Sequence, residues 1–142
     1  MRMYEVIEFT NLYENIKDSK MSLKTAYKFS RLMQQLEKEI NFYQTEFAKI
    51  LQSYAKKDSE GNFLISDDGD SVEIVPGKEL ECNTKILELR SLEVEVKDIT
   101  FKLQELDDLQ LTISELSCIL SLIEEWSKGA MHFCIAPFVY FI

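Results

Sequence analysis

The sequence predicts an α+β protein that is mostly helical and forms a single domain over residues 1–142. A long segment free of Gly and Pro carries apolar residues at helical spacing, and an Asp-Gly pair lies between two β-prone runs. Four Gly and two Pro leave little room for the many tight turns of a β-sandwich. At 142 residues the chain is long enough to bury a core without a disulfide or a metal, and its 46 % of hydrophobic residues is typical of globular proteins. We expect that core over residues 10–126, followed by an apolar C-terminal tail over 127–142.

The first twenty residues leave two interpretations open. Residues 3–9 (MYEVIEF) fit either a short strand or the lead-in to a helix. Thr10 then predicts a capped helix of one or two turns that ends near residues 18–20.

The strongest pattern is a long helix that begins after Ser22 and runs to about Lys57. Its apolar residues follow an unbroken heptad seam, typical of a coiled coil, at Phe29, Met33, Leu36, Ile40, Tyr43, Phe47, Ile50 and Tyr54. We favour a seam that packs within the molecule, with self-association as the alternative. Aromatic residues at four of the eight positions disfavour a parallel dimeric zipper.

Two further elements follow the long helix. Residues 63–66 and 71–75 flank Asp67-Asp68-Gly69-Asp70, which predicts a β-hairpin. Pro76-Gly77 ends the hairpin, and a second helix is expected from about Lys78 to Ser91.

Residues 89–106 fit two patterns. Leu92, Val94 and Val96 alternate with charged residues, and the alternation resumes one residue out of phase at Ile99, so a short strand pair is predicted. The same segment also fits a helix, which would give a second long arm antiparallel to the first. The β-branched density of VEVKDIT favours strand.

The C-terminal part is expected to hold one more helix and the tail. Thr112 and Glu115 form a capping-box pattern, and a final helix is predicted from there to about Trp126. Residues 129–142 carry no acidic or basic side chain, but they are too few for a membrane span. We expect the tail to pack into the core; contact with a partner or another copy and shallow membrane association are alternatives.

Charge is divided unevenly along the chain, whose net charge is −9. Residues 22–57 carry seven Lys/Arg against three Glu, whereas residues 58–125 carry five Lys/Arg against eighteen Asp/Glu. We favour mutual neutralisation within the molecule, with a nucleic-acid mimic or an acidic face for a basic protein as alternatives. Direct nucleic-acid binding is not expected, because phosphate contacts need a basic surface. The candidate protein-binding face comprises Glu93, Glu95, Asp98, Glu105, Asp107 and Asp108.

Residues for catalysis or metal binding are scarce. His132 is the single histidine, and with Cys134 it supplies only two ligands, fewer than a zinc site needs. The three cysteines (Cys82, Cys118 and Cys134) are an odd number at wide spacing, which fits a reducing cytosol. The acidic turn lacks the ligand spacing of a calcium loop, and no phosphate-binding loop occurs. We therefore expect no cofactor, no metal and no enzymatic activity.

Two segments resemble an uncharacterised family of small proteins encoded by phages of Gram-positive bacteria. The first is the start of the long helix from Leu23 to Lys28, together with the break at its end formed by Lys57, Asp58, Gly61 and Asn62. The second covers residues 92–120, and the likeness as a whole covers about residues 10–125. Its motifs describe a fold and carry no chemistry, so no functional residue is carried over.

The resemblance implies a phage protein, and the composition indicates one that binds other macromolecules. Our first hypothesis is a non-enzymatic accessory protein in the host cytoplasm that binds and inhibits or diverts a host protein, for instance a component of antiviral defence. The second is a virion structural or assembly protein, such as a connector, a tail component or a prefoldin-like assembly chaperone. In that case the seam and tail would serve a homo-oligomer. The third is an enzyme or a protein that sequesters a small ligand.

Overall fold

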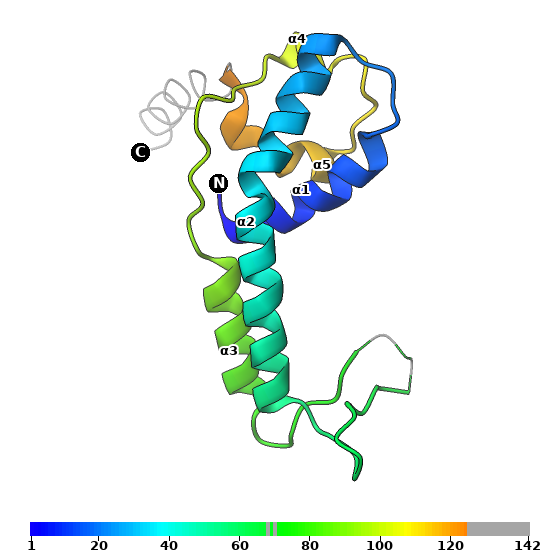
Figure 1. Cartoon of the computed structure of the whole chain (residues 1–142), viewed down its shortest axis with the longest axis vertical. Helices are drawn as coiled ribbons and strands as arrows, with labels where there is room; N and C mark the ends of the chain where they lie inside the picture. Colours follow the sequence, from blue (N-terminus) through cyan, green and yellow to red (C-terminus); the bar gives the residue numbers. More distant parts are fainter. Residues whose placement is uncertain (68, 70, 125–142) are drawn as a thin grey trace, which may run out of the picture.

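The computed structural model describes residues 1–67, 69 and 71–124, which form a head and a projecting arm (Figure 1). The described elements are α1 (Met3–Ile16), α2 (Leu23–Tyr54), α3 (Glu79–Arg90), α4 (Leu103–Leu106), α5 (Ile113–Ser117) and the 3-10 helix η1 (Leu120–Leu122). The head contains α1, the first half of α2, α4, α5 and η1, and the arm pairs the second half of α2 with α3. The prediction of a mostly helical protein with one long helix is confirmed.

Helix α2 connects the head to the arm and begins as predicted. The hydroxyl of Ser22 accepts a hydrogen bond from the Thr25 amide at 3.2 Å and caps the helix. The helix ends at Tyr54, three residues before the predicted end, where Ala55 turns to extended backbone. Its heptad seam faces inward: Phe29, Leu36, Ile40 and Tyr43 are buried, and Met33, Phe47 and Ile50 pack against the same core. The seam therefore packs within the molecule.

Helix α1 is longer than predicted, and the strand interpretation of residues 3–9 is wrong. Its buried residues recur every three or four positions, at Met3, Val6, Phe9, Leu12 and Ile16, as a helix requires. The Phe9 ring lies 6.3 Å from that of Phe29 on α2. Thr10 does not cap a helix, since its hydroxyl donates to the Ile7 carbonyl at 2.6 Å. The core therefore includes residues before position 10.

The arm is an antiparallel pair of helices, and the predicted second helix is confirmed to within one residue at each end. Cys82 and Leu89 are buried against α2. Two tyrosine hydroxyls on α2 join the helices at opposite ends of α3: Tyr54 donates to Glu81 at 3.0 Å, and Tyr43 accepts from Arg90 Nε at 3.2 Å.

The end of the arm consists of three short extended segments. Isolated β-bridges join Ala55 to Ile74, Lys57 to Phe63 and Ile65 to Val72. Within the described residues these bridges do not build a named strand, so a regular β-hairpin stays a prediction. Residues 68 and 70 of its turn lie outside the described part.

Residues 92–102 run in extended form from α3 back to the head, beside α2 (Figure 1). The helical interpretation of residues 89–106 is wrong over residues 91–102, because α3 ends at Arg90 and the chain is helical again only in α4 (Leu103–Leu106). The described segment makes isolated bridges, Arg2 to Glu93 and Phe101 to Ile123, in place of the predicted strand pair. The phase slip in its apolar pattern coincides with Asp98, whose φ of 59° is left-handed. This turn lets Val94 and Phe101, on either side of it, both be buried.

The predicted final helix is not continuous. Thr112 caps α5 by accepting from the Glu115 amide at 3.1 Å, as expected, but α5 ends at Ser117. The chain then tightens into η1, because the Leu122 carbonyl and the Glu124 amide bond to the backbone of Phe101 at 2.8 Å each. Trp126 and the tail over 127–142, with His132 and Cys134, lie outside the described residues. No helix in the described part has the length and apolar character to cross a membrane.

Candidate functional site

The six predicted acidic residues occupy two parts of the molecule. Glu93, Glu95 and Asp98 lie on the extended segment, whereas Glu105 belongs to α4 and Asp107 and Asp108 follow it. Five of the six are exposed, and Glu93 pairs with Arg2 at 3.1 Å. A recognition face made of these carboxylates stays a prediction.

Glu105 differs from the other five because it binds within the molecule. Its side chain is 12 % exposed and accepts hydrogen bonds from Lys28 Nζ at 2.7 and 2.9 Å, while Lys24 Nζ lies 3.7 Å away. Burial disfavours its ionised form, but the bonds from Lys28 and from the Lys102 amide outweigh burial and lower the pKa of this carboxyl. Basic α2 residues thus neutralise an acidic residue of the second half, which is the arrangement we favoured from the charge distribution.

The two described cysteines are poor nucleophiles. Burial, together with the charges of Glu8 and Glu5, raises the pKa of Cys118 to about 12. Burial also raises the pKa of Cys82. Since the thiolate is the reactive form, both are protonated at neutral pH. Among the described residues there is also no group of three His, Cys, Asp or Glu placed to hold a metal.

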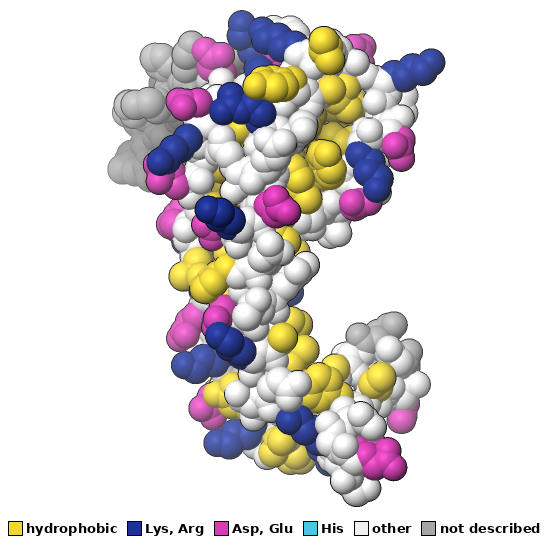
Figure 2. All heavy atoms as spheres, in the orientation of Figure 1, with side chains coloured by type: hydrophobic (Ala, Val, Ile, Leu, Met, Phe, Trp, Pro, Cys, Tyr) yellow, Lys and Arg dark blue, Asp and Glu magenta, His cyan; other side chains and the backbone are white. Residues whose placement is uncertain are grey.

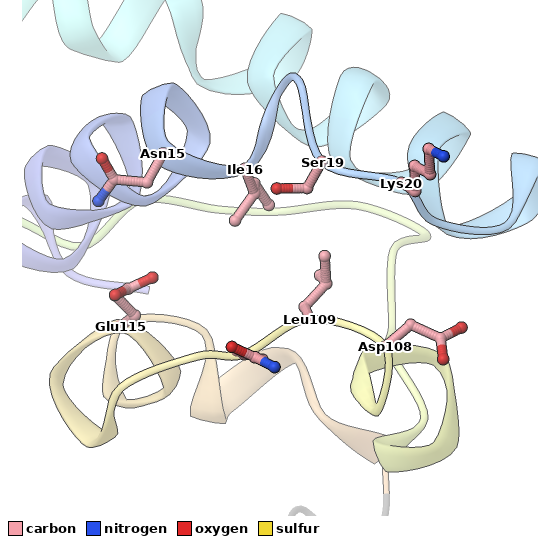
Figure 3. A pocket seen from close by; sticks show the side chains of 8 residues that line it. Asn15, Ile16, Ser19, Lys20, Asp108, Leu109 and Glu115 are labelled. Carbon is pink, nitrogen blue, oxygen red and sulfur yellow. The ribbon is translucent and has the colours of Figure 1, made fainter.

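A cleft of about 520 Å³ separates the end of α1 from the segment that leads into α5 (Figure 3). Ile16 and Leu109 point toward one another from opposite walls, and both are nearly buried in the core. Asn15 lies opposite Glu115 at one end of the cleft, and Lys20 and Asp108 lie at the other. Ser19 and Gln110 complete the lining. The cleft therefore has two apolar side chains between its ends, which we term its floor, and a rim of hydrogen-bonding groups.

A smaller hollow of about 200 Å³ continues the cleft along α1. It shares Asn15 and Glu115 with the first and adds Glu8, Asn11, Leu12 and Ser114. Glu115 is held in place by the Thr112 hydroxyl, which donates to it at 3.1 Å. The side-chain amides of Asn11, Asn15 and Gln110 make no hydrogen bond within the described part of the chain.

The outward face of α3 is the second exposed feature. Leu80 and Leu87, one heptad apart, are 81 % and 63 % exposed and point away from the buried Cys82 and Leu89. Figure 2 shows hydrophobic side chains exposed along the arm between charged ones. A row of four residues at spacings of four, three and four runs along this face and includes the C-cap residue of the helix. We term it the outer stripe of α3 (Leu80, Thr84, Leu87 and Ser91).

The polar groups of the outer stripe are satisfied within the helix. The Thr84 hydroxyl donates to the Leu80 carbonyl at 2.8 Å, and the Ser91 hydroxyl donates to the Leu87 carbonyl at 2.7 Å. Consequently the stripe bears no charge and has few groups that require water. Its spacing is that of a helix-packing seam.

Comparison of the chain with protein families, curated proteins and solved structures gave no match.

Sequence reasoning did not find the cleft or the outer stripe. Asn11 and Asn15 stand out only once α1 is known to be helical, because residues four apart then share a face. The stripe was detectable, since residues 80, 84, 87 and 91 follow the same 4-3-4 spacing as the α2 seam. A helix that is apolar on two opposite faces is the signal that was overlooked.

Proposed function

We propose that this chain is a non-enzymatic protein-binding module. The observation that carries the proposal is the outer stripe of α3, whose two exposed leucines lie a heptad apart on an uncharged helix face. Exposed apolar groups of this kind are typical of surfaces that become covered by a partner. The described cysteines also lack the acidity that a nucleophile needs.

The partner proposed for the stripe is an amphipathic helix of another protein. Helix α3 has 12 residues and is thus about 18 Å long. A symmetric contact between two copies through this stripe alone would fall short of the roughly 1,200 Å² that stable interfaces bury. A longer helix that also contacts the neighbouring surface of the arm would bury more.

The biological role we propose is that of a phage accessory protein that binds a host protein in the host cytoplasm and inhibits or diverts it. The resemblance to small phage proteins, the size and the strong acidity support this role. A part in virion assembly is the alternative, and in that case the partner would be a phage structural protein.

An affinity capture with designed arm variants tests the proposal. We would compare the wild type with Leu80→Glu/Leu87→Lys, which places charges on the outer stripe in the order that suits the helix dipole. The control, Asn41→Glu/Ala48→Lys, places the same charges a heptad apart on exposed positions of α2. Lysates of uninfected and infected host cells would be used, and binding to the purified captured protein would then be measured by calorimetry.

Three results would separate the alternatives. We expect the wild type and the control to capture a host protein stoichiometrically. The stripe variant should fail to capture it. Capture of phage structural proteins, and only from infected cells, would support the alternative role in virion assembly. If the stripe variant binds the captured protein as tightly as the wild type does, the stripe is not the binding surface.

A further inference from the structure

We infer that the cleft between α1 and residues 108–115 binds an extended peptide segment of a partner, with an apolar side chain on its floor and an adjacent Lys or Arg beside Glu8 and Glu115. This inference rests on the proposed protein-binding function and assigns it a second contact site. The apolar pair at the floor, the free amides of α1 and the charge of the rim each support it.

The floor suits one apolar side chain. Ile16 and Leu109 face one another there, and each belongs to the core cluster of the head. Both side chains are packed in the core and are only 5 % and 7 % exposed, so the small apolar surface that they offer is held in place before a ligand arrives. Binding an apolar group there costs little reorganisation.

The amides on α1 match the repeat of an extended chain. Asn11 and Asn15 are four residues apart, which on a helix corresponds to an axial distance of about 6 Å. An extended chain presents its N–H and C=O pair to the same side every second residue, about 6.6 Å apart. Each amide has both a donor and an acceptor, so each can pair with one residue of the peptide backbone.

The chain already uses this mode of binding internally. The side-chain amide of Gln35 on α2 donates to the Lys97 carbonyl at 2.8 Å and accepts from the Lys97 amide at 3.0 Å. A helix-borne amide thereby holds extended backbone against the helix. Asn11 and Asn15 offer the same pairing on α1 and have no such backbone opposite them within the described residues.

Charge selects the flanking residue of the peptide. Glu8 and Glu115 both line the smaller hollow, whose lining does not include Lys20, and neither forms an ion pair within the described part of the chain. A Lys or Arg of the peptide is therefore favoured beside these carboxylates, and an Asp or Glu is repelled.

A display experiment with random hexapeptides tests the inference. The full chain, Asn11→Ala/Asn15→Ala, Glu8→Gln/Glu115→Gln and the stripe variant Leu80→Glu/Leu87→Lys would be immobilised in parallel, and the library would be selected on each. Asn83→Ala serves as the matched control, because it removes an exposed helical amide on α3. Circular dichroism would establish that every variant is folded.

We expect peptides with Lys or Arg next to an apolar residue to be enriched on the wild type and on the control. Each double variant should bind the best peptide about tenfold more weakly, and added salt should reduce the binding further. Enrichment of acidic peptides, equal enrichment on all variants, or none would overturn the inference. Peptides lost only with Leu80→Glu/Leu87→Lys would place binding on the outer stripe, so that the proposed function stands while the cleft inference fails.

Discussion

At the scale of single residues, the contacts of Glu105 connect the basic start of α2 to the acidic second half of the chain. The carboxylate is nearly buried and receives hydrogen bonds from Lys28 and from the Lys102 amide. Removing its charge would leave the Lys28 ammonium, 22 % exposed, without its anion. Paired groups of this kind contribute more to stability than freely exposed pairs do.

Glu105→Gln is therefore expected to lower the free energy of unfolding by about 1–2 kcal/mol, measured by urea denaturation at pH 7. Glu93→Gln removes the partner of Arg2 in an exposed pair and should cost less than about 1 kcal/mol. Equal effects of the two substitutions would contradict an internal role for Glu105.

Because its pKa differs between the folded and unfolded states, Glu105 should make the free energy of unfolding depend on pH. The folded-state pKa of Glu105 is lowered, so its contribution is present above the unfolded-state pKa and is lost as pH falls through the folded-state value. The difference between wild type and Glu105→Gln should shrink as the solution is acidified below about pH 4.5. A difference that stays constant down to pH 3 would contradict this assignment.

Cys118 gives a third prediction at this scale. Its thiol is buried, donates to the Glu115 carbonyl at 3.0 Å and has a pKa of about 12. It should therefore resist alkylation by iodoacetamide at pH 8 in the folded protein and react fully in urea, as read by mass spectrometry of the Cys118 peptide. Rapid labelling in the folded state would show that α5 opens readily or that the thiol is accessible.

At the scale of elements, the extended segment over residues 92–102 depends on the side chain of Gln35. A strand normally satisfies its backbone through a neighbouring strand, but here the amide of a helix residue pairs with Lys97. Two hydrogen bonds to the backbone from one side chain fix the segment beside α2.

Gln35→Ala should consequently release this segment without unfolding the helices. We expect the Lys97 amide to lose its protection from hydrogen exchange and the free energy of unfolding to fall by about 1–2 kcal/mol. Gln34→Ala, at the exposed neighbouring position, is the control. Unchanged protection at Lys97 would mean that the packing of Val94 and Ile99 and the backbone bonds at the two ends of the segment hold it without Gln35.

The elements also show how far the sequence predicts the fold. The long helix, its Ser22 cap, the inward seam and α3 were predictable because each depends on local periodicity and capping. The length of α1 and the break after α5 were not, because they depend on contacts between distant residues: Phe9 packs on Phe29, and Leu122 and Glu124 bond to Phe101. The extended conformation of residues 92–102 likewise depends on their contact with Gln35, and no local sequence pattern indicates that contact.

The candidate sites were less predictable than the fold. Sequence reasoning selected acidic residues by their density, yet Glu105 proves to be an internal ion-pair partner. The cleft requires α1 and residues 108–115 to meet in space, and their separation along the chain hides that meeting. A surface site assembled from residues of several kinds on two distant segments leaves little trace in composition.

At the scale of the whole molecule, the head and the arm are suited to different contacts. The head buries most of the core and carries the cleft, whereas the arm extends α2 beyond the head and presents α3 outward (Figure 1). The heptad seam of α2 is covered by the chain itself, first in the head and then by α3. The apolar groups that remain exposed on α3 are therefore available to a different molecule.

Site-specific photo-crosslinking would show whether α3 contacts another molecule in the cell. A photoreactive phenylalanine analogue would replace Leu87 on the outer stripe or Ala48 at an exposed position of α2, in protein produced inside host cells. We predict one crosslinked partner from position 87 and none from position 48. Absence of a crosslink at position 87, or the same products from both positions, would contradict the account of α3 as a protein-binding surface.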